Sequence, residues 1–331
     1  MEHQHTQPFI SIMKNYPEQL LDLVAEGRKF IGYFCTYTPI EVIHASGFVP
    51  IRLLGGSGPV EKAYSLVPDF ICPYMKRTLE KALAGKFDFL SGVIQGYTCD
   101  VACGLVNIWK EHTSGDIFAT VPLPYNDTPA GRNFFKAEID NLIKRLNNAG
   151  GTFSMSALIN SIELYGNIRR HLMSLYKDGY AGRLPLSAEE LHYIGLASTI
   201  TPPETFLDML RTLSSSIEDT PLTIRSEGMP VLISGSLIED PLVSCVSIER
   251  RKEMVLNACR EYKIDGVVMH RNKSCVPITL GQMDIKRTLE KELGIPSVII
   301  DADHMDARNF SVAQFQARAD AFMEMLLAKK F

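Results

Sequence analysis

Four of the seven cysteines in this 331-residue chain occupy positions where parallel α/β proteins keep reactive groups. Each comes just after an expected strand or at the start of the helix that follows one, and they are Cys35, Cys72, Cys99 and Cys275. Thiolate-only ligation suits zinc or an iron–sulfur cluster. The sequence has no Cys-x-x-Cys pair of the kind that marks small zinc modules. We therefore favour a cluster held by ligands from distant loops.

The other three cysteines have simpler interpretations. Cys245 and Cys259 fall at the start and in the middle of one expected helix, where a cysteine is usually a small buried apolar residue. Cys103 lies four residues after Cys99, on the same face of a helix that begins there. It is a reserve ligand, and the sequence leaves open which of the two binds. The helix N-termini after Cys72 and Cys99 should lower the thiol pKa and favour the thiolate.

The elements that must position these cysteines form a βα alternation. Apolar runs lie at residues 29–34, 48–54, 88–96 and 116–122, and again at 229–236, 265–271 and 296–303. Amphipathic helical stretches separate them, which predicts two parallel sheets. Helical spacing without strand signals fills the middle of the chain. We predict an N-terminal α/β lobe at 1–129, a helical connecting segment at 130–227 and a C-terminal α/β lobe at 228–331.

Because the carboxyl ends of parallel strands share one edge of a sheet, we expect the four thiolates to converge in the cleft between the lobes.

Charge and composition argue against several other classes of protein. A net charge of −4 without a basic stripe argues against nucleic-acid binding. No apolar run reaches the roughly 18 residues of a membrane span, and the first residues lack a secretory signal. We expect a cytoplasmic protein with reduced cysteines. The GGSG at 55–58 lacks the ending of a phosphate loop, so the chain should not hydrolyse ATP itself.

Five segments carry a resemblance to a known family: GYFCTYTPIEVIHASGFVPIRL, ICPYMKRTLEKALAG, TCD, DGVVMHRNKSC and IPSVIIDADHMDARNFSVAQFQARADAFMEML. Together they resemble, nearly end to end, the 2-hydroxyacyl-CoA dehydratase and benzoyl-CoA reductase subunit family (2-hydroxyglutaryl-CoA dehydratase D-component type). The resemblance implies two flavodoxin-like, Rossmann-like lobes with an oxygen-sensitive [4Fe-4S] or related larger cluster in the interlobe cleft. It also implies a homologous partner subunit, an acyl-CoA substrate bound at the dimer, and electrons from a separate ATP-dependent iron–sulfur activator.

In such dehydratases, low-potential electrons drive the radical dehydration of an (R)-2-hydroxyacyl-CoA to an enoyl-CoA. The resemblance implies that the substrate-binding subunit holds its cluster with three cysteines, which leaves one iron open to oxygen ligands. This chain instead has cysteine at all four matching positions: Cys35, Cys72, Cys99 and Cys275. We therefore expect an electron-transferring, β-type subunit of a heterodimer. The alternatives are a benzoyl-CoA reductase-like or double-cubane-type reductase subunit, a homodimeric relative, a cluster-free acyl-CoA-binding or scaffolding subunit, and a structural zinc site.

Polar residues near the motifs have less decisive roles. Glu41 is interpreted as an ordinary first-turn acid, while His44 and Arg52 could guide a proton or a CoA phosphate. The segment that leads into Cys275 contains His270, Arg271 and Lys273, whose charge and hydrogen bonds could tune the reduction potential of a cluster. Four residues at the end of the last expected strand and in the loop that follows it are interpreted as scaffold: Asp301, Asp303, Asp306 and Arg308. Three hydroxyls could donate to cluster sulfur, those of Thr36, Tyr37 and Ser274.

Overall fold

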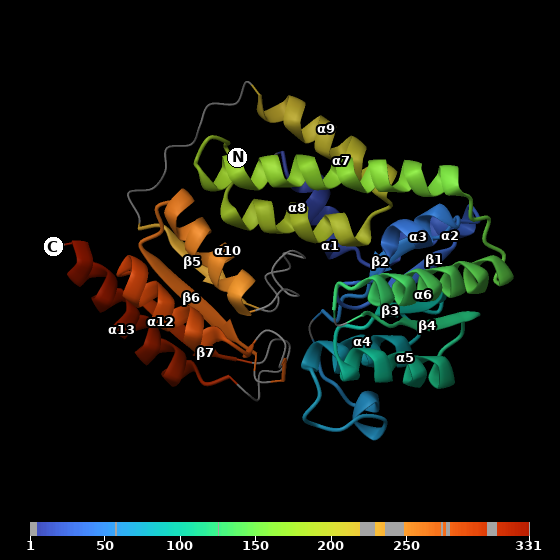
Figure 1. The fold of residues 1–331 in the computed structure, drawn as a ribbon, viewed down its shortest axis with the longest axis horizontal. Coiled ribbons are helices and arrows are strands. Elements are labelled where there is room, and N and C mark those ends of the chain that lie inside the picture. The colour runs from blue at the N-terminus through green and yellow to red at the C-terminus, as the bar shows by residue number, and fades with distance from the viewer. Residues whose placement is uncertain are drawn as a thin grey trace. The chain divides into compact units, whose positions relative to one another are not determined.

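The structure, a computed structural model, describes residues 5–56, 58–124, 126–218, 229–235, 248–272, 274–275, 279–302 and 310–330 (Figure 1). The chain divides into two compact units. The first unit comprises Met1–Asp69 and Met75–Leu222, and the second comprises Phe70–Tyr74 and Thr223–Phe331. Each unit contains a parallel sheet of its own, which confirms the predicted α/β fold class.

The sheet of the first unit has four parallel strands in the order β2-β1-β3-β4. The strands are β1 (Phe30–Tyr33), β2 (Val49–Arg52), β3 (Leu90–Gly96) and β4 (Ile117–Val121). Each falls within a run that predicted it, because strands buried on both faces are mostly apolar. In flavodoxin-like sheets of this order the topological switch point lies between the first and third strands. Here that point lies between β1 and β3.

Helices cover both faces of this sheet (Figure 1). They are α3 (Ile40–Ala45), α4 (Pro73–Leu83), α5 (Asp100–His112) and α6 (Pro129–Asn148). On one face, Ile43 of α3 and Leu146 of α6 share a buried cluster with Ile94 of β3. On the other, Trp109 of α5 packs edge-on against Phe34, with ring centroids 5.6 Å apart. The sheet therefore lies between two apolar layers.

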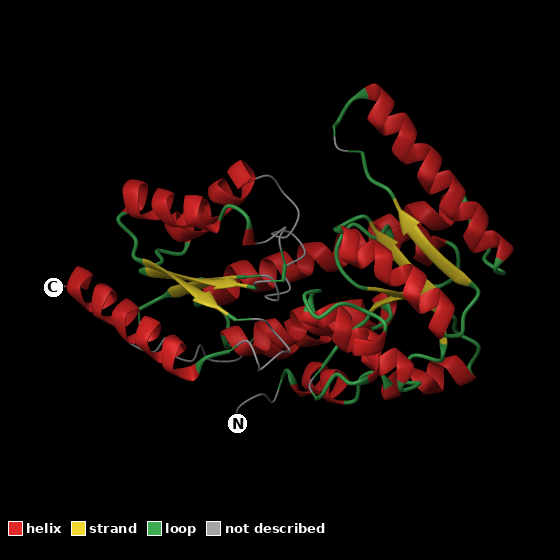
Figure 2. Cartoon of the chain, turned by 90° about the horizontal axis from the view of Figure 1, so that it is seen from below, coloured by secondary structure: helices red, strands yellow, loops and turns green. Residues whose placement is uncertain are grey.

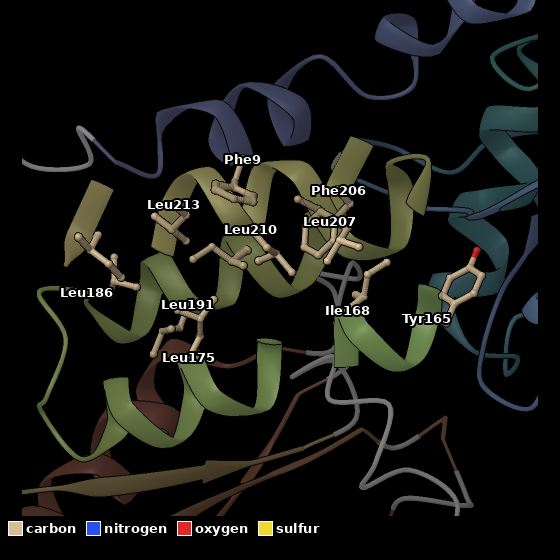
Figure 3. Packing of buried hydrophobic residues seen from close by; sticks show 13 residues of the cluster. Phe9, Tyr165, Ile168, Leu175, Leu186, Leu191, Phe206, Leu207, Leu210 and Leu213 are labelled. Carbon is tan, nitrogen blue, oxygen red and sulfur yellow. The ribbon is translucent and has the colours of Figure 1, made fainter. Parts of the chain in front are cut away.

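A layer of helices completes the first unit, and a single apolar cluster joins them (Figure 3). The helices are α1 (Gln7–Lys14), α7 (Met155–Tyr180), α8 (Ala188–Ile200) and α9 (Pro203–Ile217). Phe9, Ile168, Leu191 and Leu210 contribute one side chain from each. The described part of the predicted helical segment contains α6 to α9 and no strand. Three short elements precede α4: η1 (Glu18–Leu20), α2 (Leu21–Ala25) and η2 (Lys62–Ser65).

In the second unit, the described residues form a three-stranded parallel sheet in the order β5-β6-β7. Its elements are β5 (Val231–Ser234), β6 (Gly266–Arg271), β7 (Ser297–Asp301), α10 (Ile248–Glu261), α12 (Gln282–Leu293) and α13 (Val312–Lys330). Helices lie on both sides of this sheet (Figure 2). A Cβ atom at Gly266 would lie 2.6 Å from the side chains of Phe322 and Leu326, so glycine lets α13 approach β6 closely. Among the described helices, none combines the length and apolar character needed to span a bilayer.

Candidate functional site

Cys35 lies in the loop that leaves β1. Its neighbour Phe34 is fully buried, and the Phe34 carbonyl oxygen accepts a hydrogen bond of 2.8 Å from Nε of Arg52. Two residues after Cys35, Tyr37 has a φ of 67° in the left-handed region and is 42% exposed. Few residues other than glycine adopt this conformation without a local reason. The loop therefore turns sharply just beyond the thiol.

Cys99 lies in the loop that leaves β3 and is the N-cap residue of α5. Its Sγ atom accepts a hydrogen bond of 3.4 Å from the backbone N–H of Ala102. A serine or aspartate is usual at such a position because an oxygen can satisfy the first helical N–H groups. A sulfur in this role lies at the positive end of the helix dipole.

Burial is the main influence on the pKa of the Cys99 thiol. Desolvation raises the pKa of the Cys99 thiol, although the backbone N–H groups of Ala102 and Val101 act in the opposite direction. Desolvation, together with the charges of Cys99 and Asp100, raises the pKa of Cys103 to about 11. The prediction of a lowered thiol pKa at Cys99 is therefore wrong, because partial burial of the sulfur raises that pKa. Cys103 lies on the first turn of α5, as the spacing predicted.

The loops that carry Cys35 and Cys99 are packed against each other. A Cβ atom at Gly96 would lie 2.2 Å from the carbonyl oxygen of Tyr37, so this position accepts only glycine. The backbone N–H of Gly96 donates to Oγ1 of Thr38 at 3.1 Å. Both cysteines thus follow adjacent strands at the switch point of the first sheet, where open α/β proteins bind their ligands.

Cys72 and Cys275 belong to the second unit. Cys72 directly precedes α4, which begins at Pro73 as predicted. Cys275 follows β6, and its N–H donates to the carbonyl oxygen of Asn272 at 3.0 Å. In the described ranges, no group of three or more His, Cys, Asp or Glu residues is arranged to hold a metal ion. The convergence of all four cysteines stays a prediction.

Three polar residues of the first motif stabilise the fold. Glu41 forms an ion pair of 2.8 Å with Arg169 that joins α3 to α7, in line with its structural interpretation. His44 lies between Ser161 at 3.0 Å and Glu204 at 2.9 Å. These contacts join α3 to α7 and α9, and the hydrogen bond from Arg52 to Phe34 joins the end of β2 to the loop after β1.

In the second unit, Asp301 accepts hydrogen bonds from Arg271 and Arg318, the latter at 2.8 Å. The charge of Arg271 is therefore paired within the fold. His270 lies 2.7 Å through Nε2 from the carbonyl oxygen of Ala302. Cys259 is buried in the core, as predicted for a packing residue. Five other residues of interest lie outside the described residues: Cys245, Lys273, Asp303, Asp306 and Arg308.

Gln95 and Thr98 were not identified from the sequence, yet both lie beside the candidate cysteines. Gln95 is fully buried on β3, and Oε1 of its side chain accepts the backbone N–H of Cys35 at 3.2 Å. The one available signal was an amide side chain within an apolar strand, which requires internal hydrogen bonds.

Comparison with known proteins matches the sequence of this chain to one family. The family described as 2-hydroxyglutaryl-CoA dehydratase, D-component, matches residues 35–248 and 242–326. The chain belongs to this family, which confirms the resemblance found in the sequence motifs.

Three relatives are informative. A benzoyl-CoA reductase subunit of Thauera aromatica is 28% identical over 74% of this chain and 63% of its own length. The (R)-phenyllactyl-CoA dehydratase beta subunit of Clostridium sporogenes is 24% identical over 96% of this chain and 97% of its own length. The alpha subunit of the same enzyme is 41% identical, over 26% of this chain and 21% of its own length. The chain is thus similar to both kinds of subunit of one dehydratase.

Proposed function

We propose that this chain is the β-type iron–sulfur subunit of a 2-hydroxyacyl-CoA dehydratase-type enzyme. The observation that carries the proposal is the position of Cys35 and Cys99, which follow the adjacent strands β1 and β3 at the switch point of the first sheet. The (R)-phenyllactyl-CoA dehydratase beta subunit, which aligns along almost its whole length, supports the assignment.

Cys35, Cys72, Cys99 and Cys275 would hold a [4Fe-4S] or related cluster. Their chemistry fits, because sulfur ligands are the usual donors to such clusters. The N–H of Ala102, which points at Sγ of Cys99, is a donor of the kind that tunes cluster potentials. Two of the ligands come from each unit, so a bound cluster would connect the units.

When bound, the cluster would supply single electrons at low potential. The chain's own residues would hold it, limit the access of water and orient the thiolates. Phe34, which precedes Cys35 in the chain, packs edge-on against Trp109, and both rings are buried. A set of four cysteines leaves no open position for a substrate oxygen. We therefore place the acyl-CoA on a homologous α-type subunit, and the entry of electrons at an ATP-dependent activator.

A reductase subunit is the second candidate, because the benzoyl-CoA reductase relative is similar over 74% of this chain. Both candidates require the same cysteines and the same electron supply. They differ in the reaction of the partner subunit. Turnover of a 2-hydroxyacyl-CoA or of an aromatic acyl-CoA by the assembled enzyme distinguishes them.

Anaerobic purification followed by iron and sulfide analysis tests the proposal. We expect a brown protein with iron and sulfide in similar amounts. Single replacement of each of the four cysteines by Ala should lower the iron content, because the remaining ligands cannot move to fill the gap. Cys259→Ala is the matched control, since that thiol is packed in the core of the second unit. Wild-type protein that binds zinc without sulfide, or no metal at all, contradicts the proposal.

A further inference from the structure

A fully buried glutamine, Gln95, lies on β3 between the apolar residues of the first sheet. A buried amide is costly unless both its oxygen and its nitrogen find partners. Because Gln95 itself has no exposed surface, these partners come from the protein. Gln95 is therefore placed to make specific contacts within the protein.

The oxygen of the Gln95 side chain binds the loop that carries Cys35. Oε1 accepts the backbone N–H of Phe34 at 2.9 Å and that of Cys35 at 3.2 Å. Because both partners can only donate, the orientation of the amide is fixed. The backbone at Cys35 is thus anchored to the neighbouring strand.

The nitrogen of the same side chain binds the loop that carries Cys99. Nε2 donates to Oγ1 of Thr98 at 3.1 Å and to the carbonyl oxygen of Gly96 at 2.7 Å. The Thr98 hydroxyl lies 2.9 Å from the carbonyl oxygen of Thr36, to which it donates. One amide therefore links the residue before Cys99 to the residue after Cys35.

We propose that Gln95 is a positioning residue that sets the spacing of the Cys35 and Cys99 thiolates so that both bind one iron–sulfur cluster. This inference rests on the proposed function. A glutamine suits the task for two reasons. It accepts from one loop while it donates to the other, and it adds no negative charge beside anionic thiolates. A glutamate could not donate to Thr98 when ionised.

Thr98→Val and Thr98→Ser form the central pair of variants. Valine keeps the shape of the side chain and removes the hydroxyl that joins the loops, whereas serine keeps the hydroxyl. Gln95→Leu removes all the amide contacts. Thr6→Val is the control, because it also removes a hydroxyl that joins two elements: the Thr6 hydroxyl donates to Glu190 at 2.8 Å between α1 and α8, and Thr6 is more deeply buried than Thr98. Each protein is reconstituted with iron and sulfide without oxygen.

Three quantities are then compared: the rate of iron release to a chelator, the electron paramagnetic resonance signal of the reduced protein, and the unfolding midpoint of the metal-free protein. Gln95→Leu and Thr98→Val should release iron about tenfold faster, since partners of metal ligands contribute this much to metal affinity. Their resonance signals should shift. Thr98→Ser should resemble the wild type, and Thr98→Val should lower the unfolding midpoint no more than Thr6→Val does.

The outcomes separate this inference from the proposed function. Wild-type protein that takes up no iron overturns both. Wild-type protein that takes up iron, with Thr98→Val matching it in release rate and signal, overturns the inference alone. If Gln95→Leu does not fold, the comparison of Thr98→Val with Thr98→Ser decides.

Discussion

His44 and Glu204, which are 160 residues apart in the sequence, lie 2.9 Å from each other through Nε2 and Oε1. The other ring nitrogen of His44 lies 3.0 Å from Oγ of Ser161. One imidazole thus joins α3 to α7 and α9, and its ring packs edge-on against Tyr165. The hydrogen bond to His44 lowers the pKa of Glu204 despite partial burial. This contact stabilises the helical layer behind the Cys35 loop.

Glu204→Gln should therefore weaken the pH dependence of stability. A lowered carboxyl pKa in the folded state adds stability above the ordinary pKa of glutamate, and this stability is lost as the pH falls through the folded value. Because Glu204 is 52% exposed, the effect should be only about 0.5–1 kcal/mol at neutral pH. Urea unfolding at neutral pH and near pH ~4 measures the difference. Equal losses of stability at the two pH values would contradict the argument.

Asp301→Asn should destabilise the second unit by ~2 kcal/mol, because charged hydrogen bonds from two arginines are weakened at once. Burial alone would raise the pKa of Asp301, but Arg271 and Arg318 outweigh it and lower the pKa. The contribution should disappear as the pH falls below the ordinary range of aspartate. Thermal unfolding at two pH values tests this. Asp284→Asn, on the first turn of α12, is a control for the loss of a charge.

The sequence predicted the strands well because each lies in a short, mostly apolar run between turn residues, as at residues 88–96 around β3. It also placed Cys35 and Cys99 at strand ends. It could not reveal the burial of Cys99, which reversed the expected direction of its pKa shift. The partners of His44 and Gln95 come from loops and helices distant in the sequence, so local patterns carry no sign of them.

Iron should couple the unfolding of the two units. Each unit has its own apolar core, so the metal-free protein should unfold in two transitions. A ligand that binds only the folded state raises its stability, and here Cys35 and Cys99 would share that ligand with Cys72 and Cys275. Calorimetry of the iron-loaded protein should show higher midpoints that approach one another. A rise of one midpoint alone would show that iron binds within one unit, and midpoints that do not move on loading would show that iron binds neither unit.

The chain should work only with a homologous partner. Because the α and β subunits of one dehydratase both resemble this chain, co-expression with an α-type subunit should give a heterodimer that purifies in equal amounts. Activity should require this pair and the activator. Analytical ultracentrifugation and turnover assays measure both properties. A monomer that remains fully active at every concentration would contradict the assignment.

The choice between Cys99 and Cys103 can be made by replacing each in turn. Cys99 caps α5 and its sulfur already accepts the N–H of Ala102, whereas Cys103 lies one turn further along the helix. Only Cys99 lies in the loop that the Gln95 side chain connects to Cys35 through hydrogen bonds. Cys99→Ala should therefore lose iron and change the spectrum, while Cys103→Ala should keep both. If Cys103→Ala empties the site and Cys99→Ala leaves iron content and spectrum unchanged, Cys103 is the ligand and the Gln95 link serves only the fold.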